Sequence, residues 1–142
     1  MKEIVVTSLK NFQNEVAYGD GGKTFFVDEP TSVGGNDTGP DPYTLVLAGL
    51  GGCTSMTAML YARRKGWNLE RVRVRLISER VHAKDCADCR SEPDAFIHRI
   101  SRVIEFEGDL TDEQIVRLRE IAAKCPVGKM LESEIRIVDA QA

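Results

Sequence analysis

The sequence predicts a protein of the α+β class. Strand-like and helix-like segments occupy separate stretches of the chain instead of alternating one by one, which is typical of that class. Residues 42–62 form an uncharged run of helical length, whereas residues 69–76 alternate between apolar and charged side chains with the period of a strand. The chain has 142 residues, so we expect a single domain over residues 1–142.

The composition is typical of a soluble globular protein. Hydrophobic residues make up 42% of the chain and charged residues 29%, which argues against disorder. The net charge is −3, so we expect no nucleic-acid partner. Residues 1–6 lack the apolar core of a signal peptide, and four cysteines without an export signal indicate a reducing compartment, the cytoplasm. In that compartment thiols are more often catalytic or metal-binding than structural.

Three short strands are expected at the start of the chain, at residues 4–6, 14–18 and 23–28. The glycine-rich stretch at 18–22 is strong turn chemistry, so these strands form an antiparallel meander. Residues 29–40 are polar and rich in glycine and proline, and they form a loop that leads to the next element.

A long helix is expected over Pro42–Lys65. Asp41 is a good N-cap, proline is favoured at the first helical position, and the three cations at 63–65 precede Gly66, as a helix C-terminus favours. The helix is apolar or small on every face, which predicts that it is buried on most sides.

The length of this helix also permits a membrane span. Its threonines and serine (Thr44, Thr54, Ser55 and Thr57) and its three glycines instead favour a buried core helix, so we expect no membrane partner. Cys53 lies at its centre, directly after Gly51 and Gly52. Glycines at this point indicate that another backbone or a ligand approaches closely.

A long hairpin is expected next. Residues 69–82 form a half-buried strand whose apolar face carries Val72, Val74 and Leu76 and whose other face carries solvated arginines. Residues 96–107 form the second strand, and residues 83–95 connect the two.

An amphipathic helix and a last strand complete the expected elements. Thr111 and Gln114 form a capping box at the start of the helix. The helix ends at residues 124–126, because Pro126 disfavours helical geometry at the residue before it. Residues 134–138 (Glu134-Ile135-Arg136-Ile137-Val138) are expected to form a final strand.

The hairpin connection carries a second group of cysteines. Cys86 and Cys89, together with His82 and His98, have the ligand types of a tetrahedral zinc site. A disulfide between the two cysteines, or two thiols in an exposed turn, explains them equally simply. We expect no bound metal and no other cofactor.

The sequence resembles the OsmC/Ohr family, the osmotically inducible and organic hydroperoxide resistance proteins. The residues concerned are Gly39-Pro40-Asp41-Pro42, Gly51-Gly52-Cys53-Thr54 and Cys125-Pro126-Val127. The resemblance implies an intertwined homodimer in which long central helices are wrapped by antiparallel sheets. It also implies thiol-based reduction of organic hydroperoxides, in which Cys53 attacks the peroxide, Cys125 resolves the product and a dithiol regenerates both.

Elementary thiol chemistry agrees with these roles. A thiolate becomes a sulfenic acid when it attacks the O–O bond, and a second thiol captures the sulfenic acid as a disulfide. Cys125 follows a helix C-terminus, where the dipole disfavours a thiolate, so it is expected to be the poorer attacker.

The chain departs from the family pattern at the residues that activate the attacking thiolate. Peroxidatic members hold the attacking thiolate with a glutamate near the start of the helix and with an arginine from the N-terminal half. Here the helix begins Tyr43-Thr44, and the first arginine in the chain is Arg63. We therefore expect weaker activity than in members with the full set. Two alternatives are a non-catalytic member that binds a small apolar ligand in the dimer crevice beside Cys53, and a zinc-stabilised interaction module.

Overall fold

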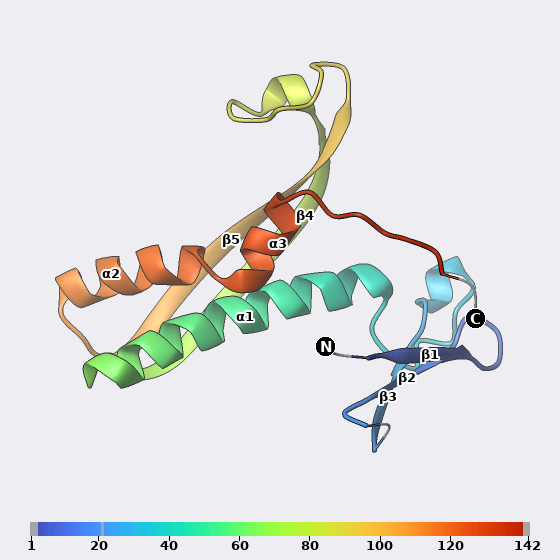
Figure 1. The fold of residues 1–142 in the computed structure, drawn as a ribbon, viewed down its shortest axis with the longest axis horizontal. Helices are drawn as coiled ribbons and strands as arrows, with labels where there is room; N and C mark the ends of the chain where they lie inside the picture. Colours follow the sequence, from blue (N-terminus) through green and yellow to red (C-terminus); the bar gives the residue numbers. More distant parts are fainter. Residues whose placement is uncertain (1–2, 21, 141–142) are drawn as a thin grey trace. The chain divides into compact units, whose positions relative to one another are not determined.

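The computed structural model describes residues 3–20 and 22–140, and its helices and strands are shown in Figure 1. The chain divides into two compact units, residues 1–48 and residues 49–142, which we describe in turn.

The first unit contains the expected antiparallel meander. Its strands are β1 (Val5–Ser8), β2 (Asn14–Tyr18) and β3 (Lys23–Val27), paired in the order β1-β2-β3. A short 3-10 helix, η1 (Thr31–Val33), lies in the polar loop that follows. The buried Asp28 carboxylate organises this loop by accepting hydrogen bonds from the Glu29 backbone N–H and from the N–H and hydroxyl of Thr38.

Helix α1 (Pro42–Lys65) has the bounds that the sequence predicted. The Asp41 side chain accepts a hydrogen bond from the Thr44 backbone N–H, which confirms the N-cap. The expectation of burial on most sides is wrong for the single chain, in which the buried residues form one stripe: Leu50, Gly51, Thr54, Ala58 and Ala62. In length and composition α1 is apolar enough to cross a membrane, although a core helix meets the same criterion.

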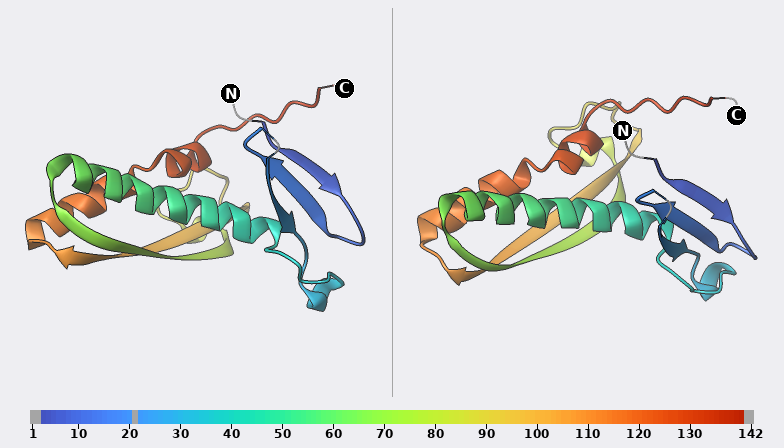
Figure 2. Two further views of the ribbon diagram at one scale, coloured as in Figure 1. Left: turned by 90° about the horizontal axis from the view of Figure 1, so that it is seen from below. Right: turned by 60° about the horizontal axis from the view of Figure 1, so that its bottom comes forward.

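Strands β4 (Asn68–His82) and β5 (Phe96–Asp109) form the long hairpin of the second unit. Val74 pairs with Ile104 on the face that turns toward the helices. The expected arginine row lies on the other, exposed face, where Arg71 and Arg75 form salt bridges with glutamates of β5. Figure 2 shows the hairpin running along α1 and α2.

The core of the second unit lies where α1, α2 and the hairpin meet. Leu118 and Ala122 of helix α2 (Asp112–Ala123) pack against Ala58 and Ala62 of α1 and against Leu69 of β4. The predicted capping box at Thr111 is present, with both of its hydrogen bonds formed. The core therefore joins the second half of α1 to α2 and the hairpin.

The C-terminal part of the chain differs from the prediction. A short helix, α3 (Pro126–Glu132), follows α2 directly, and the sequence did not predict it. The prediction of a strand at residues 134–138 is wrong, because these residues have no regular structure in the single chain. A strand needs a neighbouring strand for its backbone hydrogen bonds, and none pairs with this segment among the described residues.

Candidate functional site: a pair of thiols beside an arginine

The two free cysteines of the chain come from different elements of the second unit. Cys53 lies in the middle of α1 and is half-buried. Cys125 lies at the corner between α2 and α3 and is fully buried. Proline at 126 ends the first of these helices and begins the second, so Cys125 is the N-cap of α3.

The Cys125 sulfur is surrounded by hydrogen-bonding groups. The Gly128 backbone N–H donates to its Sγ over 3.3 Å, and the Thr54 hydroxyl lies 3.4 Å away. Thr54 is itself fully buried and donates to the Leu50 carbonyl, one turn earlier in α1. A Cβ at position 128 would lie 3.1 Å from Cys125 Sγ, so the glycine leaves room for the sulfur. Cys125 thus occupies a close-fitting polar site inside the unit.

An arginine completes this site. Arg102 of β5 donates from Nη1 to Thr54 Oγ1 over 3.0 Å and to Cys125 Sγ over 3.6 Å. Its Nη2 donates to the Ala123 carbonyl over 3.5 Å, at the end of α2. The sequence led us to expect that the usual arginine from the N-terminal half is missing, and Arg102 is a different arginine, which the sequence analysis did not single out. The arginine comes from the hairpin instead of from the N-terminal half, and it contacts Cys125.

These contacts change the ionisation of Cys125. Burial raises the pKa of the thiol, whereas hydrogen bonds from Thr54, the Gly128 N–H and Cys53, together with the charge of Arg102, lower it. The lowering contributions dominate, so the pKa of Cys125 lies below the ordinary value of a cysteine. The neighbouring donors and the charge of Arg102 thus outweigh the unfavourable end of α2, and the expectation that Cys125 is the poorer attacker stays a prediction.

Cys53 has a different environment. Its Sγ accepts a hydrogen bond of 3.5 Å from the Val127 backbone N–H, and Cys53 is one of the groups that lower the pKa of Cys125. The Thr57 hydroxyl donates to the Cys53 carbonyl over 2.7 Å. The structure therefore brings the two sequence-predicted residues together, with Cys53 as the more accessible sulfur.

The glycines before Cys53 behave differently from each other. A Cβ at Gly51 would lie 2.8 Å from a methyl carbon of Leu76, so the hairpin does approach α1 closely there. At Gly52 an added Cβ meets nothing within 4 Å, and the same holds at Gly49. The sequence predicted the approach of a backbone or a ligand, whereas in the single chain the neighbour of Gly51 is a leucine side chain and Gly52 has no neighbour within 4 Å.

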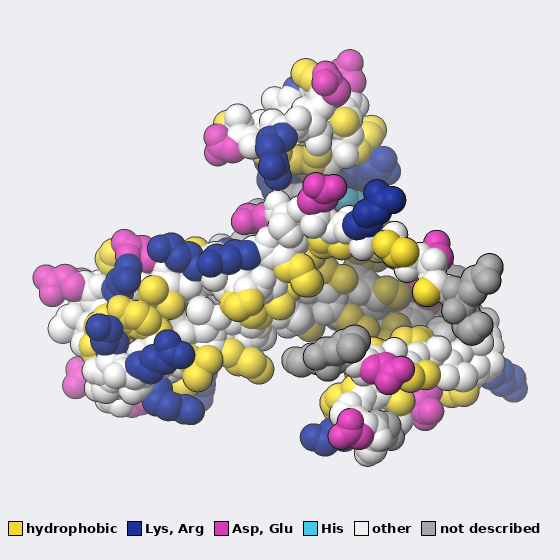
Figure 3. Space-filling view, viewed as in Figure 1, with side chains coloured by type: hydrophobic (Ala, Val, Ile, Leu, Met, Phe, Trp, Pro, Cys, Tyr) yellow, Lys and Arg dark blue, Asp and Glu magenta, His cyan; other side chains and the backbone are white. Residues whose placement is uncertain are grey.

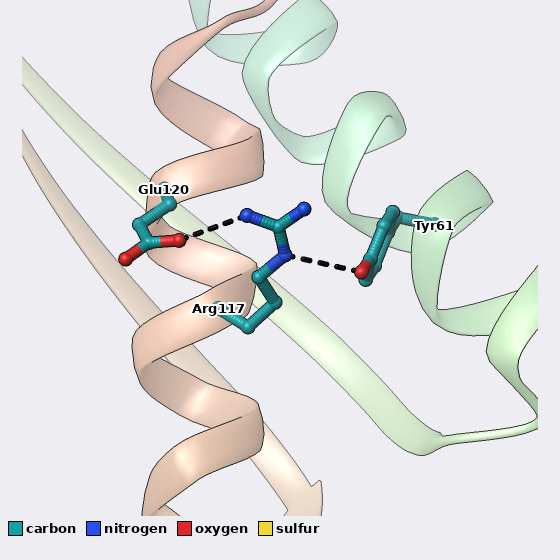
Figure 4. A network of polar contacts seen from close by, with 3 residues as sticks. All are labelled: Tyr61, Arg117 and Glu120. Carbon is teal, nitrogen blue, oxygen red and sulfur yellow. Dashed lines mark hydrogen bonds and ion pairs between the residues drawn. The ribbon is translucent and has the colours of Figure 1, made fainter.

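An open pocket lies between the second half of α1 and the end of α2, and neither cysteine is among its lining residues. It has a volume of about 380 Å³ and is lined by Thr57, Leu60, Tyr61, Arg64, Ile121, Lys124 and Pro126. One wall is held in place by Arg117, which donates to the Tyr61 hydroxyl and pairs with Glu120 (Figure 4). The pocket combines apolar surface with two cations, and it lies one helical turn from Cys53.

Cys86 and Cys89 form a disulfide in the hairpin connection. Among the described residues there is no group of three or more histidine, cysteine or acidic side chains placed to hold a metal ion. His82 stacks on Phe96 with ring centroids 4.1 Å apart. Of the interpretations that the sequence left open for these cysteines, the structure contains the disulfide.

Arg102 could have been found from the sequence. The alternation of β5 places it on the same face as Ile100, Ile104 and Phe106, which is the face toward the helices. An arginine in a row of inward apolar residues needs a polar partner inside the protein. The alternation does not identify that partner, because Cys125 reaches it only through the packing of α2 and α3.

Comparison with known proteins identifies the family. Residues 34–138 match the family model described as OsmC-like protein. No curated protein matches the chain. Several solved structures share its fold at low sequence identity. Among them, an OsmC-like protein from Mycoplasma pneumoniae has a TM-score of 0.70 and 16% identity, with 93% of this chain and 87% of that chain covered.

Two further structures with this fold are organic hydroperoxide resistance proteins. One, from Legionella pneumophila, has a TM-score of 0.62 and 17% identity, with 91% and 88% of the two chains covered. The other, OhrB of Bacillus subtilis, has a TM-score of 0.59 and 17% identity, with 92% and 89% covered. The fold is therefore shared across nearly the whole length of each. Since the family model itself spans the thiol pair and most of the chain, the protein belongs to the OsmC-like family.

Proposed function

We propose that the protein reduces organic hydroperoxides with Cys53 and Cys125 as a redox pair. The observation that carries the proposal is the meeting of two free thiols from α1 and the α2–α3 corner beside a cation. Membership of the family and a fold shared with two organic hydroperoxide resistance proteins support it. The substrate class is taken from those relatives.

The geometry suggests the order of events. Cys53 reacts first because the residue is partly exposed, whereas Cys125 is fully buried. The Cys53 thiolate attacks the peroxide, an S–O bond forms, the O–O bond breaks, and the alkoxide takes up a proton to leave as an alcohol. Cys125 then captures the sulfenic acid as a disulfide, and an external dithiol reduces that disulfide by exchange.

The pocket between α1 and α2 is a candidate entry site for the peroxide. Its apolar wall of Leu60, Ile121 and Pro126 suits the organic part of a hydroperoxide. The same wall also supports the second candidate function, the non-catalytic binding of a small apolar ligand. Under that alternative the two thiols do not react with the ligand, and the protein has no catalytic turnover.

We also propose that the working form is a cytoplasmic homodimer, with residues 1–142 as one domain. The face of α1 opposite its buried stripe carries Gly49, Gly52, Met56 and Leu60, and the last two are 66% and 51% exposed. Figure 3 shows hydrophobic side chains exposed along α1. A second copy that covers this face would remove apolar surface from water.

A single experiment separates the two candidate functions. Reduced protein is treated with one equivalent of an organic hydroperoxide, and the product is mapped by mass spectrometry. We expect a disulfide between Cys53 and Cys125 and consumption of the peroxide. Recovery of both thiols in reduced form, with the peroxide unchanged, would overturn the redox proposal and favour ligand binding.

A further inference from the structure

We infer that Arg102 and Thr54 hold Cys125 as a standing thiolate, ready to attack oxidised Cys53. This inference rests on the proposed redox function. Under this inference Arg102 is a positioning residue: it acts through Cys125, the resolving thiol, and does not itself touch the peroxide.

The first observation is the surplus of donors around one sulfur. The Gly128 N–H and Arg102 Nη1 both donate to Cys125 Sγ, and the Cys53 side chain is a further group beside it. Thr54 Oγ1 lies 3.4 Å away, but its proton goes to the Leu50 carbonyl, so it is not counted among these donors. A neutral thiol is a weak acceptor and also has a proton of its own to place. A thiolate accepts from every side, so this arrangement matches the charged form of a side chain that is fully buried.

The second observation is the charge balance of Arg102. Among the described residues it forms no salt bridge with a carboxylate, unlike Arg71, Arg75 and Arg99 on the exposed face of the hairpin. It is half-buried in a row of inward apolar residues, where a cation without a counter-charge is unfavourable. The Cys125 sulfur is the group beside it that can carry a negative charge. Arg102 and Cys125 therefore form an internal ion pair.

Thr54 links the two partners. Its hydroxyl has one proton, which the Leu50 carbonyl accepts over 2.8 Å, and its oxygen accepts from Arg102 over 3.0 Å. Arg102 is thus fixed between Thr54 and the Ala123 carbonyl, with Nη1 directed at the sulfur. The ionisable groups that face Cys125 are Arg102 from β5 and Cys53 from α1, and of these two Arg102 favours the thiolate by its charge.

The ion pair would speed the second step of the cycle. The Cys125 thiolate attacks Sγ of the Cys53 sulfenic acid, the S–S bond forms and the S–O bond breaks, and the departing hydroxide takes up a proton to become water. No oxidant beyond the hydroperoxide is needed. A thiol that is already deprotonated attacks without a prior proton transfer, so the disulfide forms sooner. The sulfenic acid then has less time to be oxidised further to sulfinic acid.

The test measures the ionisation of Cys125 directly. In a Cys53→Ser background, Cys125 is the remaining free thiol, and its thiolate is followed by ultraviolet absorbance against pH, with the Cys53→Ser, Cys125→Ser protein as the blank. Arg102→Gln should raise the pKa of Cys125 by about 1 unit or more, because a neighbouring opposite charge is lost. Arg102→Lys should restore part of the shift, and Arg75→Gln, on the exposed face of the same hairpin, should leave it unchanged.

A second readout uses the protein with both thiols. After one equivalent of hydroperoxide, the sulfenic acid on Cys53, trapped with dimedone, should persist about tenfold longer in Arg102→Gln for each unit of pKa shift at a pH below that pKa. Thr54→Val keeps the shape of the side chain and should also lengthen the lifetime of the sulfenic acid. This variant tests the inference if Arg102→Gln does not fold. An unchanged titration of Cys125 in the folded Arg102 and Thr54 variants would overturn the inference. Absence of both a sulfenic acid and a Cys53–Cys125 disulfide after peroxide treatment would instead refute the proposed function, and the titration, which needs no peroxide, keeps the two outcomes separate.

Discussion

Arg102 occupies a position at which the strand pattern would otherwise place an apolar side chain. Its neighbours on the inner face are Ile100 and Ile104, and its partner across the hairpin is Leu76. Placing a guanidinium there has a desolvation cost, which the contacts to Thr54, Cys125 and the Ala123 carbonyl offset. A residue retained at such a cost is a strong candidate for a functional role.

The two cysteines were predictable from the sequence, but their environments were not. The motifs Gly51-Gly52-Cys53 and Cys125-Pro126 identify the thiols as a pair. The groups that lower the pKa of Cys125 were missed because local sequence does not show which elements pack against the corner at Pro126. The groups around the Cys125 sulfur come from α1, from β5 and from the first turn of α3, and those from α1 and β5 are distant in sequence.

At the same scale, the two serine variants should fail in different ways. Cys53→Ser should abolish peroxide turnover, because the accessible sulfur that attacks the O–O bond is gone. Cys125→Ser should allow one oxidation per protein and then stall, with a sulfenic acid that dimedone traps on Cys53. Steady-state peroxide consumption with a dithiol reductant, together with mass spectrometry, measures both. Equal activity in the wild type and in Cys53→Ser would contradict the assignment.

At the scale of elements, local signals predicted the helices that begin and end with clear caps. The bounds of α1 follow from Asp41, Pro42 and the cations before Gly66, and the start of α2 follows from its capping box. Helix α3 was missed because it is short and begins at a proline that also ends the previous helix. The strand expected at 134–138 depends on a pairing partner, which local sequence does not reveal.

The hairpin connection should tolerate loss of its disulfide. Cys86 and Cys89 enclose a short loop, and most residues of the connection are exposed. Short loops lose little conformational entropy on closure, so Cys86→Ser with Cys89→Ser should lower the free energy of unfolding by about 2 kcal/mol or less. Chemical denaturation measures this value, and peroxide turnover should be unchanged.

The matched control for that variant is Leu118→Ala. Leu118 is fully buried in the core between α1, α2 and the hairpin, so its truncation should cost about 2–5 kcal/mol. If the loop variant cost as much as the core variant, or if reduced protein bound stoichiometric zinc, the zinc-stabilised module would replace our interpretation of this loop.

At the scale of the whole molecule, the single chain leaves several apolar features unpaired. The face of α1 with Gly52 and Met56 is open, and residues 134–138 carry Ile135 and Ile137 at 54% and 86% exposure in alternate positions. Both features were expected to be buried or paired on the basis of sequence. A second copy would satisfy both expectations at once, by covering the helix face and supplying a neighbour for the unpaired segment.

The homodimer proposal gives the last prediction. Met56→Glu places a charge on the open face of α1, where a buried contact between copies would not tolerate it, and should convert the protein to monomers. Val116→Glu is the control, because Val116 is 56% exposed on α2 and faces no proposed interface. Obligate dimers bury roughly 2,000 Å² or more, so the wild type should sediment as a dimer at micromolar concentration.

Gly52→Leu tests the same interface without adding charge. An added side chain at position 52 meets nothing within 4 Å of its Cβ in the single chain, so the fold of one copy has room for it. Between two closely packed helices it has none, and we expect the dimer to weaken while the circular dichroism of each copy stays helical. Analytical ultracentrifugation of wild type, Gly52→Leu, Met56→Glu and Val116→Glu distinguishes a homodimer formed through the open face of α1 from a monomer. A wild-type protein that sediments as a stable, folded monomer would exclude the dimer, and the open face of α1 would then have to serve as a surface for a different partner.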